Sequence, residues 1–204
     1  LNGTIYGDCQ VPLKAFLESR GEAFQRESLL PYLYRMEKSR HWAERYSSET
    51  AMGDFEPVGE GGDYPKTGFE DGYFRDIVNM TFKQSFSVTQ ELVEDCLLGT
   101  MKQRANKLVT AYGRTREKFG RILYAGGLYG TTVSYKGKTF ACGSADGQAL
   151  FSKTHPNKVN GAKQTNLYKG TFTNTLLGKI ETEMQNIKGD NGELLGVAPD
   201  TIWI

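Results

Sequence analysis

The most regular pattern of hydrophobic and polar positions lies between residues 87 and 127. Apolar residues recur there at steps of three and four, the spacing of one helix face. They are Leu92, Val93, Cys96, Leu97, Met101, Ala105, Leu108, Val109, Tyr112, Phe119, Ile122 and Leu123. Ser87 and Gln90 fit a capping box at the start, and Gly126 with Gly127 provides an end. The pattern predicts one helix of about ten turns, roughly 55 Å long at 1.5 Å per residue.

A helix of that length in a soluble protein usually belongs to a coiled coil, a repeat or an extended assembly. Three glycines inside the stretch interrupt any sustained heptad. We therefore expect a helix that takes part in an assembly without forming a coiled coil. Flanking strand and hairpin patterns make the expected fold class α+β.

Before this helix, Phe74, Met80, Phe82 and Phe86 alternate with polar residues, which predicts a strand with one buried face. Six glycines and two prolines precede that strand, between residues 53 and 72. They predict a loop or a loosely paired hairpin over 47–86. Because an isolated hairpin is marginal in water, this arm should lie against another surface, and little of the chain remains to provide one.

The N-terminal part, residues 1–46, has a weaker pattern. Pro31 interrupts any single helix over residues 22–46, where charged residues alternate with large apolar ones. Such a segment can pack along neighbouring chains, or it can form a short helix and loop on its own domain. The sequence leaves both possibilities open.

Beyond the helix, residues 128–198 contain two further predicted elements. Two β-rich runs around Lys136 and Gly137 predict a hairpin, and a polar, loop-like stretch covers 143–170. A second helix is expected to open at Thr173, with an apolar face formed by Leu176, Leu177, Ile180, Met184 and Ile187. Residues 199–204 have the apolar pattern of a strand that continues beyond the sequence.

Charge is nearly balanced overall, at +1, but it is separated along the chain. Residues 49–76 carry eight acidic against two basic residues, and residues 102–121 carry seven basic against one acidic. A solvated helix face is the usual meaning of such a charge run. The alternative is that the acidic arm of one copy lies on the basic helix of another, where opposed charge guides register and association rate.

Candidate chemistry is sparse, and we expect no catalytic residues, no metal and no cofactor. The histidines, His41 and His155, lack cysteine partners at zinc spacing. Gly137-Lys138-Thr139 lacks the earlier glycine of a phosphate loop. A Cys142/His155 pair would suit a cysteine hydrolase, but a single thiol is usually a small buried apolar group. No apolar run approaches the ~18 residues of a membrane span.

Short motifs carry a resemblance to a known family. Residues 146–157, DGQALFSKTHPN, resemble the "LFSTAHP" stretch of the major head proteins of Mu-like prophages. Thr173-Asn174-Thr175-Leu176 resembles the "N-x-L" helix segment that follows there, and Pro199-Asp200-Thr201 the "P-x-T" strand. Residues 82–92 resemble the strand-to-helix junction. The order of elements is similar to that of tailed-phage major capsid proteins of the Hong Kong 97 type.

This resemblance implies a Hong Kong 97-like capsid fold: an N-arm (1–46), an E-loop (47–86), a spine helix (87–127), the rest of the peripheral domain (128–198) and the start of an axial-domain strand (199–204). It implies a virion capsid protein that assembles in the bacterial host cytoplasm. The icosahedral shell of hexamers and pentamers would enclose double-stranded DNA, with a portal, a scaffold and a maturation protease as partners. An encapsulin-like compartment is the alternative.

The expected inter-subunit contacts follow from the E-loop and spine-helix charges. They are Asp54, Glu56, Glu60, Asp63, Lys66, Glu70, Asp71, Lys107, Arg114, Arg116, Lys118 and Arg121. In some relatives an E-loop lysine forms an isopeptide bond to a neighbour's asparagine, and Lys66 is the only lysine in the acidic, glycine-rich part of this loop, residues 49–76. The resemblance also implies that an N-terminal segment before Leu1 is removed during maturation, and that most of the axial domain lies beyond this sequence.

Overall fold

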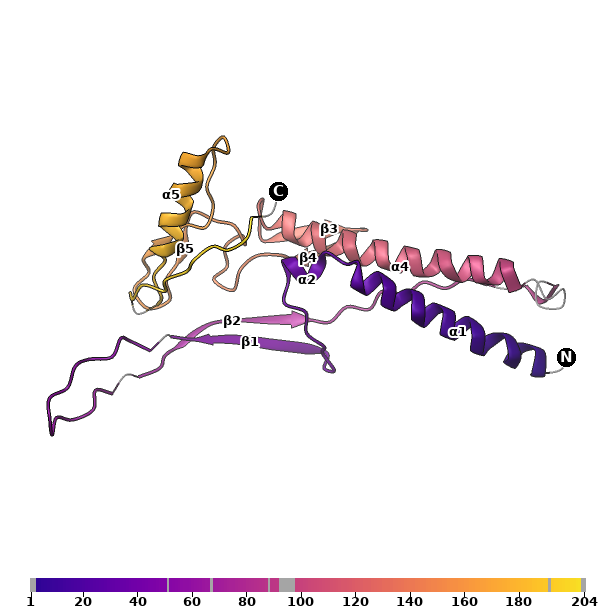
Figure 1. The fold of residues 1–204 in the computed structure, drawn as a ribbon, viewed down its shortest axis with the longest axis horizontal. Helices are drawn as coiled ribbons and strands as arrows, with labels where there is room; N and C mark the ends of the chain where they lie inside the picture. Colours follow the sequence, from indigo (N-terminus) through magenta and orange to yellow (C-terminus); the bar gives the residue numbers. More distant parts are fainter. Residues whose placement is uncertain are drawn as a thin grey trace. The chain divides into compact units, whose positions relative to one another are not determined.

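The computed structural model describes residues 3–50, 52–66, 68–87, 89–91, 98–190 and 192–202, without the side chains of residues 3–13 and 98 (Figure 1). Within this part the fold is mixed α+β, as expected, with four helices and three separate two-stranded antiparallel sheets. The chain divides into two compact units. One comprises residues 1–40, 80–125 and 135–138, and the other 41–79, 126–134 and 139–204.

The first unit is built on the long helix α4 (Leu98–Gly126). Its periodic apolar residues form a stripe, of which Met101, Ala105 and Val109 are at least 93 % buried. The described part of the predicted helix is thus confirmed from residue 98 onward. The earlier apolar positions Leu92, Val93, Cys96 and Leu97 lie outside the described residues.

Helices α1 (Gly3–Arg26) and α2 (Leu30–Leu33) provide the surface against which this stripe packs, and Figure 1 shows α1 beside α4. The approach is closest at two glycines of α4. A Cβ at Gly113 would lie 2.7 Å from Cδ1 of Phe24, and a Cβ at Gly120 would overlap Cδ2 of Leu30. Phe24 and Leu30 can therefore pack directly against the backbone of α4, because Gly113 and Gly120 have no side chains.

Tyr34, just after α2, adds to the contact between the N-terminal part and α4. Its hydroxyl donates to the carbonyl of Gly120 at 2.8 Å, and its ring meets Tyr124 edge-on with centroids 6.2 Å apart. The N-terminal part thus packs on its own chain through Phe24, Leu30 and Tyr34. Several other large apolar residues of this part remain exposed, among them Leu29, Tyr32, Met36 and Trp42.

The weak pattern of residues 1–46 did not reveal α1, which has 24 residues. The prediction that Pro31 interrupts any single helix over residues 22–46 is confirmed, because α1 ends at Arg26 and Pro31 stands in the first turn of the separate helix α2. A proline is tolerated there because first-turn amides have no acceptor within the helix.

The helix start was also predicted wrongly. The carbonyl of Ser87 accepts a hydrogen bond from Nη1 of Arg104 at 3.0 Å. An unbroken helix from residue 87 would separate these two residues by about 25 Å along its axis. Phe82 lies 5.3 Å from Phe119, centroid to centroid. Residues 82–87 therefore run back along α4 in the opposite direction, and the chain reverses before the helix.

The second unit contains the antiparallel pair β1 (Ala43–Glu49) and β2 (Asp71–Val78). Its register pairs Ala43 with Val78, and it is irregular between Ser47 and Glu49. The two strands and the connection between them, drawn as a long excursion in Figure 1, form what we call the β arm (residues 43–78). The two-stranded arm was predicted, with different bounds.

The differences lie at the arm's base and on its faces. β1 begins within the segment predicted as N-arm, and β2 ends at Val78 instead of continuing to Phe86. The expected buried face is absent from the described strands, since Phe74 is 58 % exposed and Ile77 is 51 % exposed.

The remaining elements of this part are small. β3 (Thr132–Tyr135) and β4 (Lys138–Ala141) form the predicted hairpin. Its turn residues Lys136 and Gly137 both have positive φ, 49° and 77°. This is the type I′ geometry that matches the twist of paired strands.

β5 (His155–Pro156) and β6 (Lys163–Gln164) pair within the predicted loop region. α5 (Asn174–Gln185) begins as predicted, because the Thr173 side chain accepts from the amide of Leu176. The expected strand is absent at residues 199–202, and residues 203–204 lie outside the described part.

Two alanine substitutions test whether the α4 glycines are packing positions. Gly120→Ala should lower the free energy of unfolding by about 1–3 kcal/mol, because its Cβ meets the buried Leu30. Gly178→Ala in α5 has open space around it and should raise the free energy of unfolding by up to about 1 kcal/mol through helix propensity. Chemical unfolding measures both, and equal stabilisation by the two variants would contradict the packing role.

Candidate functional site

The connecting part of the β arm is exposed in both its apolar and its acidic residues. Phe55 is 96 % exposed and Tyr64 is 89 % exposed, values unusual for aromatic side chains. The predicted contact residues Asp54, Glu56, Glu60, Asp63, Lys66, Glu70 and Asp71 are all exposed as well. Within the described part of the chain, no ion pair joins these acidic residues to a cation.

One acidic residue of the arm is used internally. Arg45 donates two hydrogen bonds to the carboxylate of Asp76, at 2.6 and 2.7 Å, and its guanidinium lies 4.8 Å from the centroid of the Phe74 ring. The hydrogen bond from Arg45 holds the pKa of Asp76 below its ordinary value. This cross-strand pair stabilises the arm's register, whereas the acidic residues of the connection are exposed.

Four of the predicted basic residues share one face of α4. At 3.6 residues per turn, Lys107, Arg114, Lys118 and Arg121 lie within about 60° of one another around the helix. They lie opposite the buried Ala105, and all four are exposed. We call them the basic face. It spans about 21 Å along the axis.

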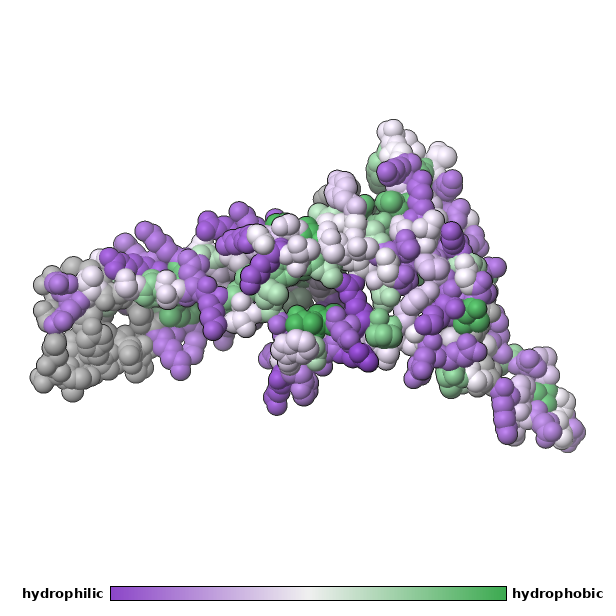
Figure 2. Space-filling view, turned by 180° about the vertical axis from the view of Figure 1, so that it is seen from behind, coloured by the Kyte–Doolittle hydropathy of each residue, from purple (hydrophilic) through white to green (hydrophobic). Residues whose placement is uncertain are grey.

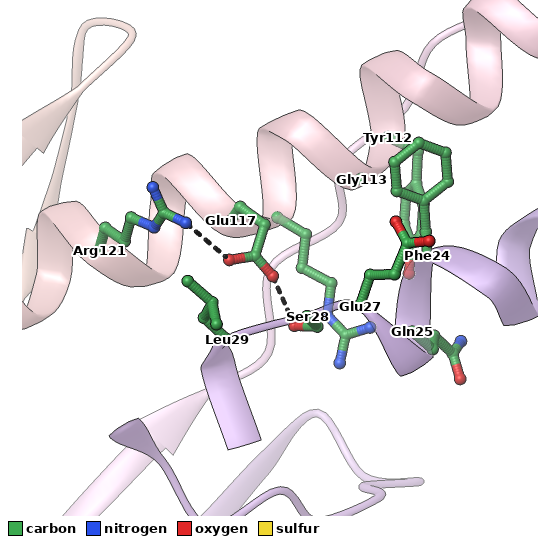
Figure 3. Close-up of a pocket in the computed structure, with 10 residues that line it drawn as sticks. Phe24, Gln25, Glu27, Ser28, Leu29, Tyr112, Gly113, Glu117 and Arg121 are labelled. Carbon is green, nitrogen blue, oxygen red and sulfur yellow. Dashed lines mark hydrogen bonds and ion pairs between the residues drawn. The ribbon is translucent and has the colours of Figure 1, made fainter. Parts of the chain in front are cut away.

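Arg116 does not belong to this face. It points to the buried side of α4 and lines a cavity of about 300 Å³ beside Phe24, Ser28 and Glu117. The sequence analysis counted Arg116 with the other basic residues, because a charge count does not tell which side of a helix a residue faces. Figure 3 shows the other residues around this cavity.

Glu117 reaches across this cavity to the N-terminal segment (Figure 3). Its Oε1 accepts from the Ser28 hydroxyl at 2.5 Å, and Nη2 of Arg121 lies 3.6 Å from its Oε2. That Oε2 is buried and accepts no hydrogen bond within the described residues. These contacts tie the segment between α1 and α2 to α4. Because the Ser28 hydroxyl already binds the Glu117 carboxylate, we interpret the contact as structural and call it the joint at Glu117.

A polar cluster that the sequence pattern did not reveal lies in the second unit. His155 Nδ1 is 2.6 Å from Oδ2 of Asp146, and His155 Nε2 is 3.2 Å from Oδ1 of Asn166. The Asp146 side chain is only 6 % exposed. Burial opposes its ionisation, but hydrogen bonds from Gln148, His155 and Ser144 outweigh that effect and hold its pKa below its ordinary value.

The candidate nucleophile pair is not assembled. The thiol of Cys142 donates to the carbonyl of Gly130 at 3.6 Å, whereas both ring nitrogens of His155 face Asp146 and Asn166. His155 lies in β5. Among the residues that the structure describes, no three His, Cys, Asp or Glu side chains gather as a metal site.

Large apolar residues at the surface are the most widespread feature of the described chain. Twenty-three of them are at least 44 % exposed, against five buried apolar residues. In Figure 2, hydrophobic residues in green lie at the surface among hydrophilic ones in purple. No helix within the described ranges is long and apolar enough to span a membrane.

Comparisons of the chain with protein-family models, curated proteins and solved structures gave no match.

The joint at Glu117 can be tested with serine substitutions. Ser28→Ala removes the hydrogen-bond donor to a buried carboxylate and should lower the free energy of unfolding by about 2 kcal/mol. Ser19→Ala, an exposed position in α1, serves as the control and should change it by less than about 0.5 kcal/mol. Urea unfolding of the full chain provides both values, and an unaffected Ser28→Ala variant would show that the joint contributes little.

Proposed function

We propose that this chain is a subunit of a self-assembling icosahedral shell, the major capsid protein of a tailed phage or prophage with a Hong Kong 97-type fold. The observation that carries the proposal is the β arm. It has two strands, it exposes Phe74 and Ile77 on its strands, and it exposes Phe55 and Tyr64 on its connection. An arm of this kind is marginal alone and becomes stable when it lies on a neighbouring subunit.

The long helix supports the same proposal. α4 buries one side against its own N-terminal segment and exposes the basic face on the other. The acidic connection of the β arm is the complementary surface. A second copy of the chain would provide a partner for both surfaces, because every copy carries the acidic connection as well as the basic face. Contacts repeated through a closed lattice accumulate into a stable shell even when each is modest.

The motif resemblance indicates which kind of shell this is. Residues 146–157 and Thr173-Asn174 are the stretches most similar to the Mu-like head proteins. In the structure, Thr173 caps α5 and residues 146–157 form the ordered turns that lead into β5. Residues that shape turns and caps determine local structure, which supports a structural role for the motif.

Electron microscopy of the purified full-length protein tests this proposal. We expect closed icosahedral shells, and packaged double-stranded DNA in shells from a producing host. Empty shells that contain an enzyme cargo would favour the encapsulin-like compartment. A compact monomer at all concentrations would overturn the shell proposal. Higher-mass bands on denaturing gels of mature shells would indicate a covalent cross-link, for which Lys66 is the candidate.

Charge reversal on the basic face tests the contact itself. Arg114→Glu combined with Lys118→Glu should slow assembly by about tenfold at low salt, because opposed charge accelerates association. Lys169→Glu combined with Lys179→Glu makes the same charge change at exposed positions outside α4 and should leave the rate nearly unchanged. Light scattering during assembly measures both. Equal rates and equal salt dependence in the two variants would contradict the charge contact.

A further inference from the structure

The hydrogen-bond partners of His155 determine which of its ring nitrogens must carry a proton. The amide group of Asn166 is held in one orientation by two backbone groups. Its Oδ1 accepts from the Ser152 amide at 2.7 Å, and its Nδ2 donates to the Leu150 carbonyl at 2.9 Å. The atom that faces His155 Nε2 is therefore an acceptor. Nε2 must carry a proton to form this hydrogen bond.

The other ring nitrogen has the same requirement. Nδ1 of His155 lies 2.6 Å from a carboxylate oxygen of Asp146, which also accepts from the Gln148 amide through Oδ1. An ionised carboxylate is only an acceptor, so Nδ1 is a donor as well. An imidazole that donates from both nitrogens is the imidazolium cation. The surroundings of His155 thus select its protonated form.

No other charged group among the described residues is seen in contact with the His155 ring. Asp146 is the acidic group in contact with the ring among the described residues. The strand paired with β5 places neutral Gln164 opposite His155, and Lys163 opposite Pro156. Because its hydrogen bonds lower the pKa of Asp146, its carboxylate remains ionised to a lower pH than that of an ordinary aspartate. The cluster therefore persists toward acid pH and weakens when the imidazolium loses its proton.

β5 also contacts the β arm. The hydroxyl of Tyr73, in β2, donates to the carbonyl of Pro156 at 3.3 Å. The ammonium of Lys158 lies 5.0 Å from the centroid of the Tyr73 ring. Pro156 follows His155 directly and Lys158 lies three residues beyond it, so a displacement of β5 would reach the arm through Tyr73.

We propose that His155 is a protonation-dependent latch that holds the β arm in place. As the imidazolium it ties the turn at Asp146, the strand β5 and the loop at Asn166 together, and Tyr73 rests on that assembly. When the ring loses its proton from Nε2 to water, two lone pairs face each other across the Nε2–Asn166 contact. β5 then loosens, and the arm loses its support at Tyr73. The latch concerns the isolated chain and does not depend on shell formation.

Hydrogen exchange in the full-length protein tests the latch. The amides of Ser152 and of β2 are followed at about pH 5 and about pH 8, the range in which histidine changes charge. Rates are expressed as protection factors, which removes the intrinsic pH dependence of exchange. We expect protection to fall about tenfold at the higher pH, the effect of one charge-assisted hydrogen bond. A nitrogen-detected titration should show both ring nitrogens of His155 protonated in the protected state.

Three variants make the test specific. His155→Gln should abolish the pH dependence, and His41→Gln, which removes the other histidine, should preserve it. Tyr73→Phe should leave the response at Ser152 intact and remove it from β2. If His155→Gln does not fold, the nitrogen titration of the unaltered chain decides alone.

Protection that is unchanged between the two pH values would overturn the latch, and so would a neutral His155 ring in the protected state. A response at Ser152 without any response in β2 would overturn its hold on the arm. Each result is read on the unassembled chain. It is therefore distinct from failure of the shell proposal, which is read by electron microscopy.

Discussion

Incomplete burial is the constraint on which the rest of this structure depends. A sheet of two strands has two faces and two edges, and within the described residues no third strand pairs with the two strands of the β arm. Its internal order comes from Arg45, which pairs with Asp76 and covers Phe74. That contact sets the register but leaves the apolar residues of the connection in water. Such a surface is costly for a monomer and useful for a subunit.

The long helix combines a packed side with an exposed one. α4 gains rigidity from one side only, where Gly113 and Gly120 allow Phe24 and Leu30 to approach its backbone. Residues 82–87 add a second support along α4, through Phe82 and the Ser87 carbonyl. Because these contacts occupy one side, the basic face on the other side remains available. The helix is thereby both a core element and an exposed surface.

The second unit is held more by polar contacts than by apolar packing. Among the residues that the structure describes, Cys142 is the one buried apolar residue of this unit, and its loops are tied by side-chain hydrogen bonds instead. Asn157 illustrates this, since its side chain binds the carbonyls of Gly189 and Asp190 and is 94 % buried. A polar network of this kind depends on protonation in a way that an apolar core does not. This is why a single histidine can influence the unit.

Local features of the sequence were sufficient for several elements. Four features depend on residues that are close together in the sequence. They are the apolar period of α4, the cap at Thr173, the turn at Lys136 and Gly137, and the separation of acidic from basic stretches. Contacts between distant residues decided the rest. The reversal before α4, the inward direction of Arg116 and the meeting of Asp146 with His155 have no local signal. Hydrophobic period and turn chemistry act over a few residues, whereas close approach at a glycine or a shared hydrogen bond exists only once distant segments are packed together.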